Sequence, residues 1–257
     1  MTAVTIGLAQ TLVIPGDVRG NLTRAAELVD EAVRNNCDIV VLPECMDVGW
    51  TDTRAHELAQ PIPGSTSDFL CAMARKNSIL IASGLTERDG EQVYNSAILI
   101  GRDGEILARH RKINELEFAR KIYGVGKELK VVDTEFGLVA LNICADNYVD
   151  SLALADAQAS MGARLLLSPS SWAVPAGHDD EATPYVEWQL PYRLIGERHN
   201  IPVIGVSNVG PVETGEWSGW SCIGRSLATD ASGNIVSWGS YGSLASELKV
   251  VQLELPD

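Results

Sequence analysis

Apolar and polar positions along the chain alternate between two periods. The run "VTIGLAQ" (4–10) is rich in apolar and β-branched residues, as expected for a strand. The following segment "NLTRAAELVDEAVRNN" (21–36) carries apolar residues at helical spacing, namely Leu22, Ala25, Val29 and Val33. Asn21 is the expected N-cap of this helix. The pattern therefore predicts a strand followed by a helix that covers one face of a sheet.

The same succession of strands and helices is predicted twice. The first half continues with a helix near 66–76 and four strand-like runs, "DIVVLPE" (38–44), "ILIASG" (79–84), "YNSAILI" (94–100) and "EILARHRK" (105–112), of which the last two are joined by the turn signal "GRDG". The second half has helices near 151–161 and 184–199 and the strand-like runs "GLVALNIC" (137–144), "RLLLSPS" (164–170), "IPVIGVSN" (201–208), "CIGRSLAT" (222–229) and "NIVSW" (234–238). Each half thus reads β-α-β-α-β-β-β.

Two halves of this kind predict two sheets, each with helices on one face. If the uncovered faces pack together, both are buried, and the fold class is α/β, a four-layer αββα sandwich of two sheets with helices outside. The sequence contains no linker, low-complexity tract or block of like charges. We therefore expect a single domain over residues 1–257.

Composition narrows the kind of partner. The formal net charge of −14 argues against nucleic acid and against an anionic membrane surface, because both attract clustered Lys and Arg. No apolar stretch approaches the roughly 20 residues that span a bilayer. The five cysteines are odd in number and lack CxxC spacing, and the N-terminus has no basic region followed by a long apolar run. These features predict a reduced, cytoplasmic protein that acts on a small molecule.

Three residues at predicted strand ends form the main candidate site. Glu44 closes "DIVVLPE", Lys112 closes "EILARHRK" and Cys144 closes "GLVALNIC". Ligands of α/β folds bind beyond the carboxyl ends of strands. A thiol with an ordinary pKa near 8.5 needs a base or a positive field to become a nucleophile at neutral pH, and Glu44 and Lys112 are expected to supply them. A helix is predicted after Cys144, so the Ala145 backbone N–H is the expected oxyanion donor.

Each of these residues also has a plain structural interpretation. Free cysteine usually packs as a small apolar side chain, and Glu44 and Lys112 are of types that are mostly exposed. Cys37, Cys71 and Cys222 lie within predicted helices or strands and are expected in the core, whereas Cys45 is expected near the site with a structural role.

The segments that hold these residues resemble a known family. "VVLPE", "YNSAILIGRDGEILARHRKIN" and "LNICADN" are similar to the three signature segments of the nitrilase superfamily of carbon–nitrogen hydrolases, and "SPSSW" and "RLIGERHNIPVIGVSNVG" resemble further family segments in the expected order. The resemblance implies an αββα sandwich and a homodimer or higher homo-oligomer. It also implies that Glu44 is the general base, Lys112 the cation that stabilises the tetrahedral intermediate, and Cys144 the nucleophile that becomes acylated.

The sequence departs from common family patterns in two places. Many members carry a second active-site glutamate between the lysine and the cysteine, but Ala119 occupies the position that aligns with it, which leaves Glu115 and Glu117 as secondary candidates. After the cysteine, many members have an aromatic residue, an aspartate and then an arginine, whereas here Ala145, Asp146 and Asn147 follow. Both differences bear on the substrate.

The leading hypothesis is a hydrolase that cleaves an amide or carbamoyl carbon–nitrogen bond without a cofactor or metal, since the four histidines are scattered. Nitrile hydrolysis or acyl transfer on the same triad, and a catalytically silent binding protein, are the alternatives. A Cys/His hydrolase with His110 or His178 as base is a further one. The following residues are expected around the substrate: Ser171, Trp172, Trp217 and Trp220. Trp188, Arg193 and Glu197 are expected at an interface or in internal pairs.

Overall fold

Two packed sheets with helices on both outer sides make up the fold. In the computed structural model, residues 2–178 and 186–256 are described. Over these residues the first sheet has the strand order β15 (Glu247–Leu255), β1 (Thr2–Gln10), β2 (Ile39–Val41), β3 (Leu80–Asp89), β4 (Gln92–Ile100) and β5 (Ile106–Arg111). The second has the order β14 (Ile235–Trp238), β13 (Leu227–Thr229), β10 (Val203–Ser207), β8 (Leu165–Ser170), β7 (Gly137–Leu141) and β6 (Val131–Thr134). A small sheet of β11 (Val209–Pro211), β12 (Ser221–Ile223) and β9 (Ala173–Val174) lies at one end.

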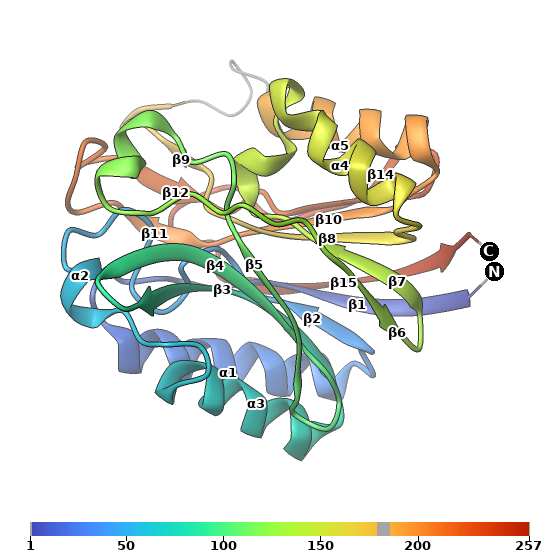
Figure 1. The fold of residues 1–257 in the computed structure, drawn as a ribbon, viewed down its shortest axis with the longest axis horizontal. Coiled ribbons are helices and arrows are strands. Elements are labelled where there is room, and N and C mark those ends of the chain that lie inside the picture. Colours follow the sequence, from blue (N-terminus) through green and yellow to red (C-terminus); the bar gives the residue numbers. More distant parts are fainter. Residues whose placement is uncertain (1, 179–185, 257) are drawn as a thin grey trace.

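The helices complete a four-layer sandwich. Figure 1 shows α1 (Val18–Arg34) and α3 (Ser65–Asn77) below the first sheet, and α4 (Leu152–Ser160) and α5 (Val186–His199) above the second. The short α2 (Ala55–Leu58) lies near one end of the first sheet. In the two large sheets, the predicted strands are neighbours in their order along the chain, if the strands that form the small sheet are left out. The predicted αββα architecture is therefore confirmed.

The period of two along β2 explains how the layers hold together. Ile39 and Val41 belong to the large apolar cluster between the sheets, which also contains Leu167 of the second sheet. Val40 belongs instead to the apolar cluster between the first sheet and its helices, with Val29 of α1. Successive side chains of a strand point to opposite faces, so this all-apolar strand is buried on both sides.

Helix α1 begins earlier than predicted. Its N-cap is Asp17, whose side chain accepts a hydrogen bond from the Gly20 backbone N–H, so the prediction of Asn21 as cap is wrong. Asn21 is fully buried inside the helix, and its amide bonds the backbone of Ile14 and the carbonyl of Asp47. The side chain therefore ties the loop before the helix to the loop that follows β2.

Two strand predictions also differ from the structure. The run "CIGRSLAT" is split into β12 and β13, because Gly224 and Arg225 both take left-handed backbone conformations with φ of 67° and 61°. The sequence reading missed β15, which pairs antiparallel with β1 along its whole length. Positions 184–185 of the helix predicted over 184–199 lie outside the described residues, and α5 begins at Val186. None of the helices in the described part of the chain is both long and apolar enough to cross a bilayer.

Candidate active site

The ends of three strands bring the predicted residues to one place. Glu44 lies shortly after β2, Lys112 directly after β5 and Cys144 shortly after β7. Lys112 Nζ is 2.6 Å from Glu44 Oε1, and both side chains are buried. Cys144 comes from the other sheet, and it lines the same cavity as Lys112. The Glu44 backbone N–H also donates to the carbonyl of Ser170 at the end of β8, which joins the two sheets at this point.

Cys144 stands on a strained turn. It is the first residue of the short 3₁₀ helix η2 (Cys144–Asn147), and its φ is +43°. A residue with a side chain rarely adopts this left-handed conformation, and such strain clusters at functional sites. Because the chain turns sharply here, Cys144 lies in the wall of the cavity.

Burial keeps the Cys144 thiol protonated. Burial and the carboxylate of Glu44 raise its pKa to about 12, while Lys112 and the backbone N–H of Ser171 act in the opposite direction. Lys112 thus lowers the pKa as expected, but burial outweighs it, so the thiol needs a base that accepts its proton. The second Glu44 oxygen, Oε2, has no hydrogen-bond partner within residues 2–178 and 186–256, and it can accept a proton.

Lys112 remains charged although it is buried. Burial opposes the charge, but the carboxylate of Glu44 is the main opposing effect, and the pKa of the ammonium is raised well above its ordinary value. The site therefore holds a fixed cation next to the nucleophile. Such a cation can stabilise an oxyanion without reorganising during the reaction.

Asn95, which the sequence reading did not select, holds both members of the ion pair. Its side-chain Nδ2 donates to Glu44 Oε1 at 2.6 Å, and its backbone carbonyl accepts from the Lys112 N–H at 2.9 Å. The sequence contains one signal, a polar residue near the start of the apolar run "YNSAILI". In the structure this residue is fully buried.

Asp146 ties the lysine loop to the nucleophile loop. Its Oδ1 accepts from the backbone N–H groups of Ile113 and Asn114, and its Oδ2 accepts from that of Ile143. His110 Nε2 lies 2.8 Å from the same Oδ2. Burial opposes the charge on Asp146, but the hydrogen bonds from His110 and Asn114 outweigh it and lower the pKa. The placement of His110 on Asp146 gives no support to a Cys/His hydrolase with His110 as base, and His178, the other candidate, is not among the residues that line the cavity of Cys144.

The two secondary candidates have different surroundings. Glu115 is buried with 1% of its surface exposed, and burial raises its pKa to about 8 against the opposing effect of Lys112. It lies beside Asn95, and among the described residues neither Glu115 oxygen nor Asn95 Oδ1 has a hydrogen bond of good geometry. Glu117 is exposed at the start of the 3₁₀ helix η1 (Glu117–Lys121). Only Glu115 is therefore brought to the ion pair.

A cavity of about 240 Å³ opens in front of Cys144. The predicted substrate-binding residues Ala145, Ser171 and Trp172 all line it, although the Ser171 hydroxyl donates to Asn208 Oδ1. The aromatic side chains that line it are Trp50, Tyr148, Trp172, Trp188, Trp217 and Trp220. Trp188 was expected at an interface or in an internal pair and instead lines this cavity, whereas Arg193 and Glu197 form the expected internal pair at 3.6 Å. No three His, Cys, Asp or Glu side chains in the described ranges are placed to hold a metal ion.

Known proteins share this arrangement of elements. The chain is 32% identical over 187 residues to the omega-amidase NIT2-A of Xenopus laevis, which covers 69% of this chain and 67% of that protein. It is 30% identical over 241 residues to a nitrilase of Pyrococcus abyssi, covering 91% of this chain and 84% of the relative. The crystal structure of a carbon–nitrogen hydrolase from Helicobacter pylori G27 matches with a TM-score of 0.88 at 19% identity, covering 98% of this chain and 90% of that one.

The family model described as carbon–nitrogen hydrolase matches residues 5–255, nearly the whole chain. This match includes both sheets and all three strand ends that meet at the cavity. The fold similarity to a solved hydrolase agrees with it. The chain is thus an enzyme of the carbon–nitrogen hydrolase family, within the nitrilase superfamily.

Proposed function

We propose that this enzyme hydrolyses the amide or carbamoyl bond of a small molecule through a thioester on Cys144, with Glu44 as general base and Lys112 as the cation that stabilises the tetrahedral intermediate. The observation that carries the proposal is the buried contact of 2.6 Å between Lys112 Nζ and Glu44 Oε1, beside the cavity that Cys144 lines. The similarity to an omega-amidase supports an amide as the bond that is cleaved.

In the first half of the reaction, Glu44 Oε2 accepts the thiol proton while the Cys144 sulfur bonds to the amide carbon. Because the thiol has a pKa of about 12, the proton leaves together with sulfur attack and not before it. The carbonyl oxygen becomes an oxyanion, to which Lys112 Nζ and the Ala145 N–H donate. Glu44 then passes the proton to the nitrogen, the carbon–nitrogen bond breaks, and ammonia or an amine leaves behind a thioester.

In the second half, Glu44 accepts a proton from a water molecule whose oxygen attacks the thioester carbon. The carbon–sulfur bond breaks as the intermediate collapses, Glu44 returns its proton to the sulfur, and the carboxylic acid leaves. Glu115 carries a proton at neutral pH, since its pKa is about 8. A neutral Glu115 can donate to Asn95 Oδ1, and so hold the amide that fixes Glu44 without adding a second negative charge beside Lys112.

Cys144 is tested by trapping the intermediate. Enzyme quenched during turnover of an amide is digested, and the acyl mass is expected on the peptide that contains "LNICADN". Cys144→Ala and Glu44→Gln are expected to lose ammonia release with their circular dichroism spectra unchanged. Cys71→Ser is the matched control, because Cys71 is half-buried on α3 and does not line the cavity.

An acyl group on another cysteine, or full turnover by Cys144→Ala, would contradict the mechanism. The same assay includes nitriles, because one relative is named a nitrilase, and we expect amides to react faster. The cytoplasmic location and the homo-oligomer stay predictions from the sequence.

A further inference from the structure

The tryptophans of this chain are concentrated around one cavity. Of six tryptophans, five line the cavity in front of Cys144. The sixth, Trp238, lies on β14 with the Arg225 guanidinium 4.8 Å from its ring centroid. This concentration therefore points to the substrate.

The aromatic rings form flat walls. Trp172 and Trp188 are stacked with centroids 4.9 Å apart and planes 13° apart, and Trp217 and Trp220 are stacked at 4.3 Å and 13°. Trp50 meets Trp217 edge to face at 5.1 Å. Because each ring is held by its neighbour, the walls are preorganised and lose little side-chain freedom on binding. Flat rings bind well against such faces.

Among the described residues, the cavity lining offers no unpaired cation to a negatively charged substrate group. Among its described lining residues the only Lys or Arg is Lys112, which is already paired with Glu44 at 2.6 Å. Glu187, exposed and also part of the lining, adds negative charge. The residues outside the described ranges, 1, 179–185 and 257, include no Lys or Arg in their sequence. A carboxylate on the acyl group would therefore lose water without gaining a counter-charge.

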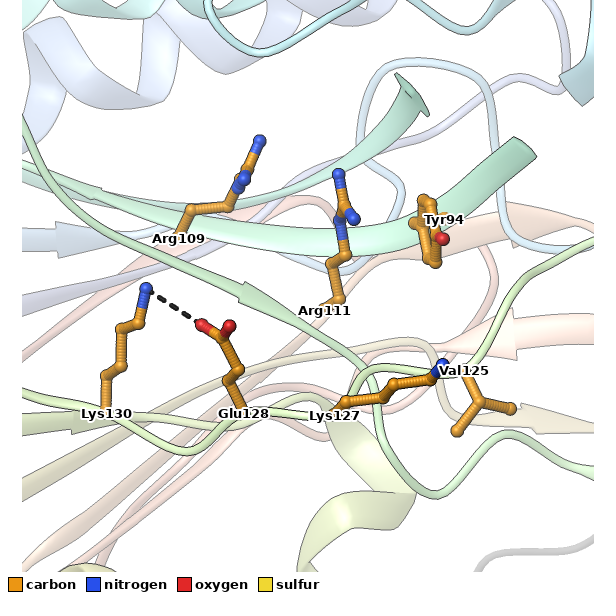
Figure 2. A pocket seen from close by; sticks show the side chains of 7 residues that line it. All are labelled: Tyr94, Arg109, Arg111, Val125, Lys127, Glu128 and Lys130. Atoms are coloured by element: carbon orange, nitrogen blue, oxygen red, sulfur yellow. Dashed lines mark ion pairs between the residues drawn. The ribbon is translucent and has the colours of Figure 1, made fainter. Parts of the chain in front are cut away.

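The chain does place basic side chains together, but around a different cavity. Arg109 and Arg111 of β5 line a second cavity of about 320 Å³ together with Lys127 and Lys130. Figure 2 shows these residues and the ion pair of Lys130 with Glu128, and both arginines pair with Glu87. This cavity shares no lining residue with the one in front of Cys144. Most of the clustered basic side chains thus lie away from the nucleophile, whose cavity is lined by one cation, Lys112, among the described residues.

We infer that the acyl group of the substrate is uncharged, flat and apolar, so that the enzyme prefers aromatic carboxamides of the benzamide type over monoamides of dicarboxylic acids. The inference rests on the proposed function in taking the substrate to be an amide. The size agrees with it, because an apolar cavity of about 150 Å³ holds benzene and the 240 Å³ cavity leaves room for the amide as well.

The test compares benzamide with succinamate, whose acyl chain ends in a carboxylate. The expected kcat/KM, measured by ammonia release at pH 7, is at least about 100-fold higher for benzamide, since a buried charge without a partner costs several kcal/mol. Trp220→Leu is expected to lower kcat/KM for benzamide about tenfold, mainly through KM, and to lower that for propionamide less. Trp238→Leu is the matched control, because that tryptophan does not line the cavity.

Binding of the two amides to Cys144→Ala tests the inferred class of substrate separately from the proposed hydrolase function. Calorimetry is expected to show that Cys144→Ala binds benzamide and does not bind succinamate. If it does so while the wild type turns over no amide, the proposed function is contradicted and the inferred class of ligand is still supported. Equal or better binding or turnover of succinamate would overturn the inference. Faster turnover of an amide that bears a quaternary ammonium would overturn it as well, because the aromatic walls would then serve a cation.

Discussion

Replacing the buried Glu115 by glutamine should change how stability depends on pH. Glutamine keeps the size of the side chain and has no charge, so it imitates the protonated carboxyl group. In the wild type, burial raises the pKa of Glu115 to about 8 from an ordinary value of 4.5. The folded state therefore holds a proton that the unfolded chain releases over this interval. The contribution of Glu115 to the free energy of unfolding of the wild type therefore falls as the pH rises from about 4.5 to about 8.

The size of the effect follows from the two pKa values. Between pH 5 and pH 7, the contribution of Glu115 to the free energy of unfolding of the wild type falls by about 2.5 kcal/mol. Glu115→Gln lacks this contribution. Its stability relative to the wild type is therefore expected to increase by about that amount over the same range.

Urea unfolding at pH 5, 6 and 7, followed by circular dichroism, measures this difference. Glu117→Gln is the matched control, because Glu117 is exposed two residues away, and its stability relative to the wild type should not change with pH in this way. A difference between Glu115→Gln and the wild type that stays constant from pH 5 to pH 7 would refute the reasoning. Glu115 would then be ionised in the folded protein, and it could not donate to Asn95.

Two further predictions concern the ion pair and the nucleophile. Lys112→Met should lower kcat by about 100- to 1,000-fold, because an oxyanion donor is lost. It should also lower the free energy of unfolding by about 3–5 kcal/mol, because Glu44 is left as an unpaired buried charge. A change in KM alone, in ammonia-release assays, would make Lys112 a binding residue. The rate at which iodoacetamide labels Cys144, followed by peptide mass spectrometry, should still rise above pH 10, since the thiol pKa is about 12. A plateau near pH 8.5 would mean that burial does not control this thiol.

The sequence predicted the main architecture and the residues at the strand ends, because both depend on local patterns. Glu44, Lys112 and Cys144 each stand at the end of a strand-like run, and loops meet at the carboxyl ends of strands in α/β folds. The missed strand β15 alternates buried and exposed residues, with Val251, Leu253 and Leu255 buried, so its signal was present in the sequence. It is separated from its partner β1 by most of the chain.

The surroundings of the site could not be predicted in the same way. Asn95 and Asp146 act through hydrogen bonds to segments about 30 to 50 residues away, which no local period encodes. Glu115 and Glu117 are two residues apart in sequence, and only the folded loop decides that one is buried and the other exposed. The sequence indicated that Lys112 favours the thiolate of Cys144, but it did not reveal that burial raises the pKa of this thiol by more than the cation lowers it.

The division of the site between the two sheets has a consequence for how this enzyme can change. Glu44 and Lys112 belong to the first sheet and Cys144 to the second, and the backbone link from Glu44 to Ser170 crosses between them. Neither sheet carries all three groups, so neither can perform the reaction alone. A variant that shifts one sheet against the other by a fraction of a side chain moves the nucleophile relative to both the base and the cation. New specificities are therefore easier to reach through the tryptophan-lined loops than through the sheets, whose packing must stay as it is.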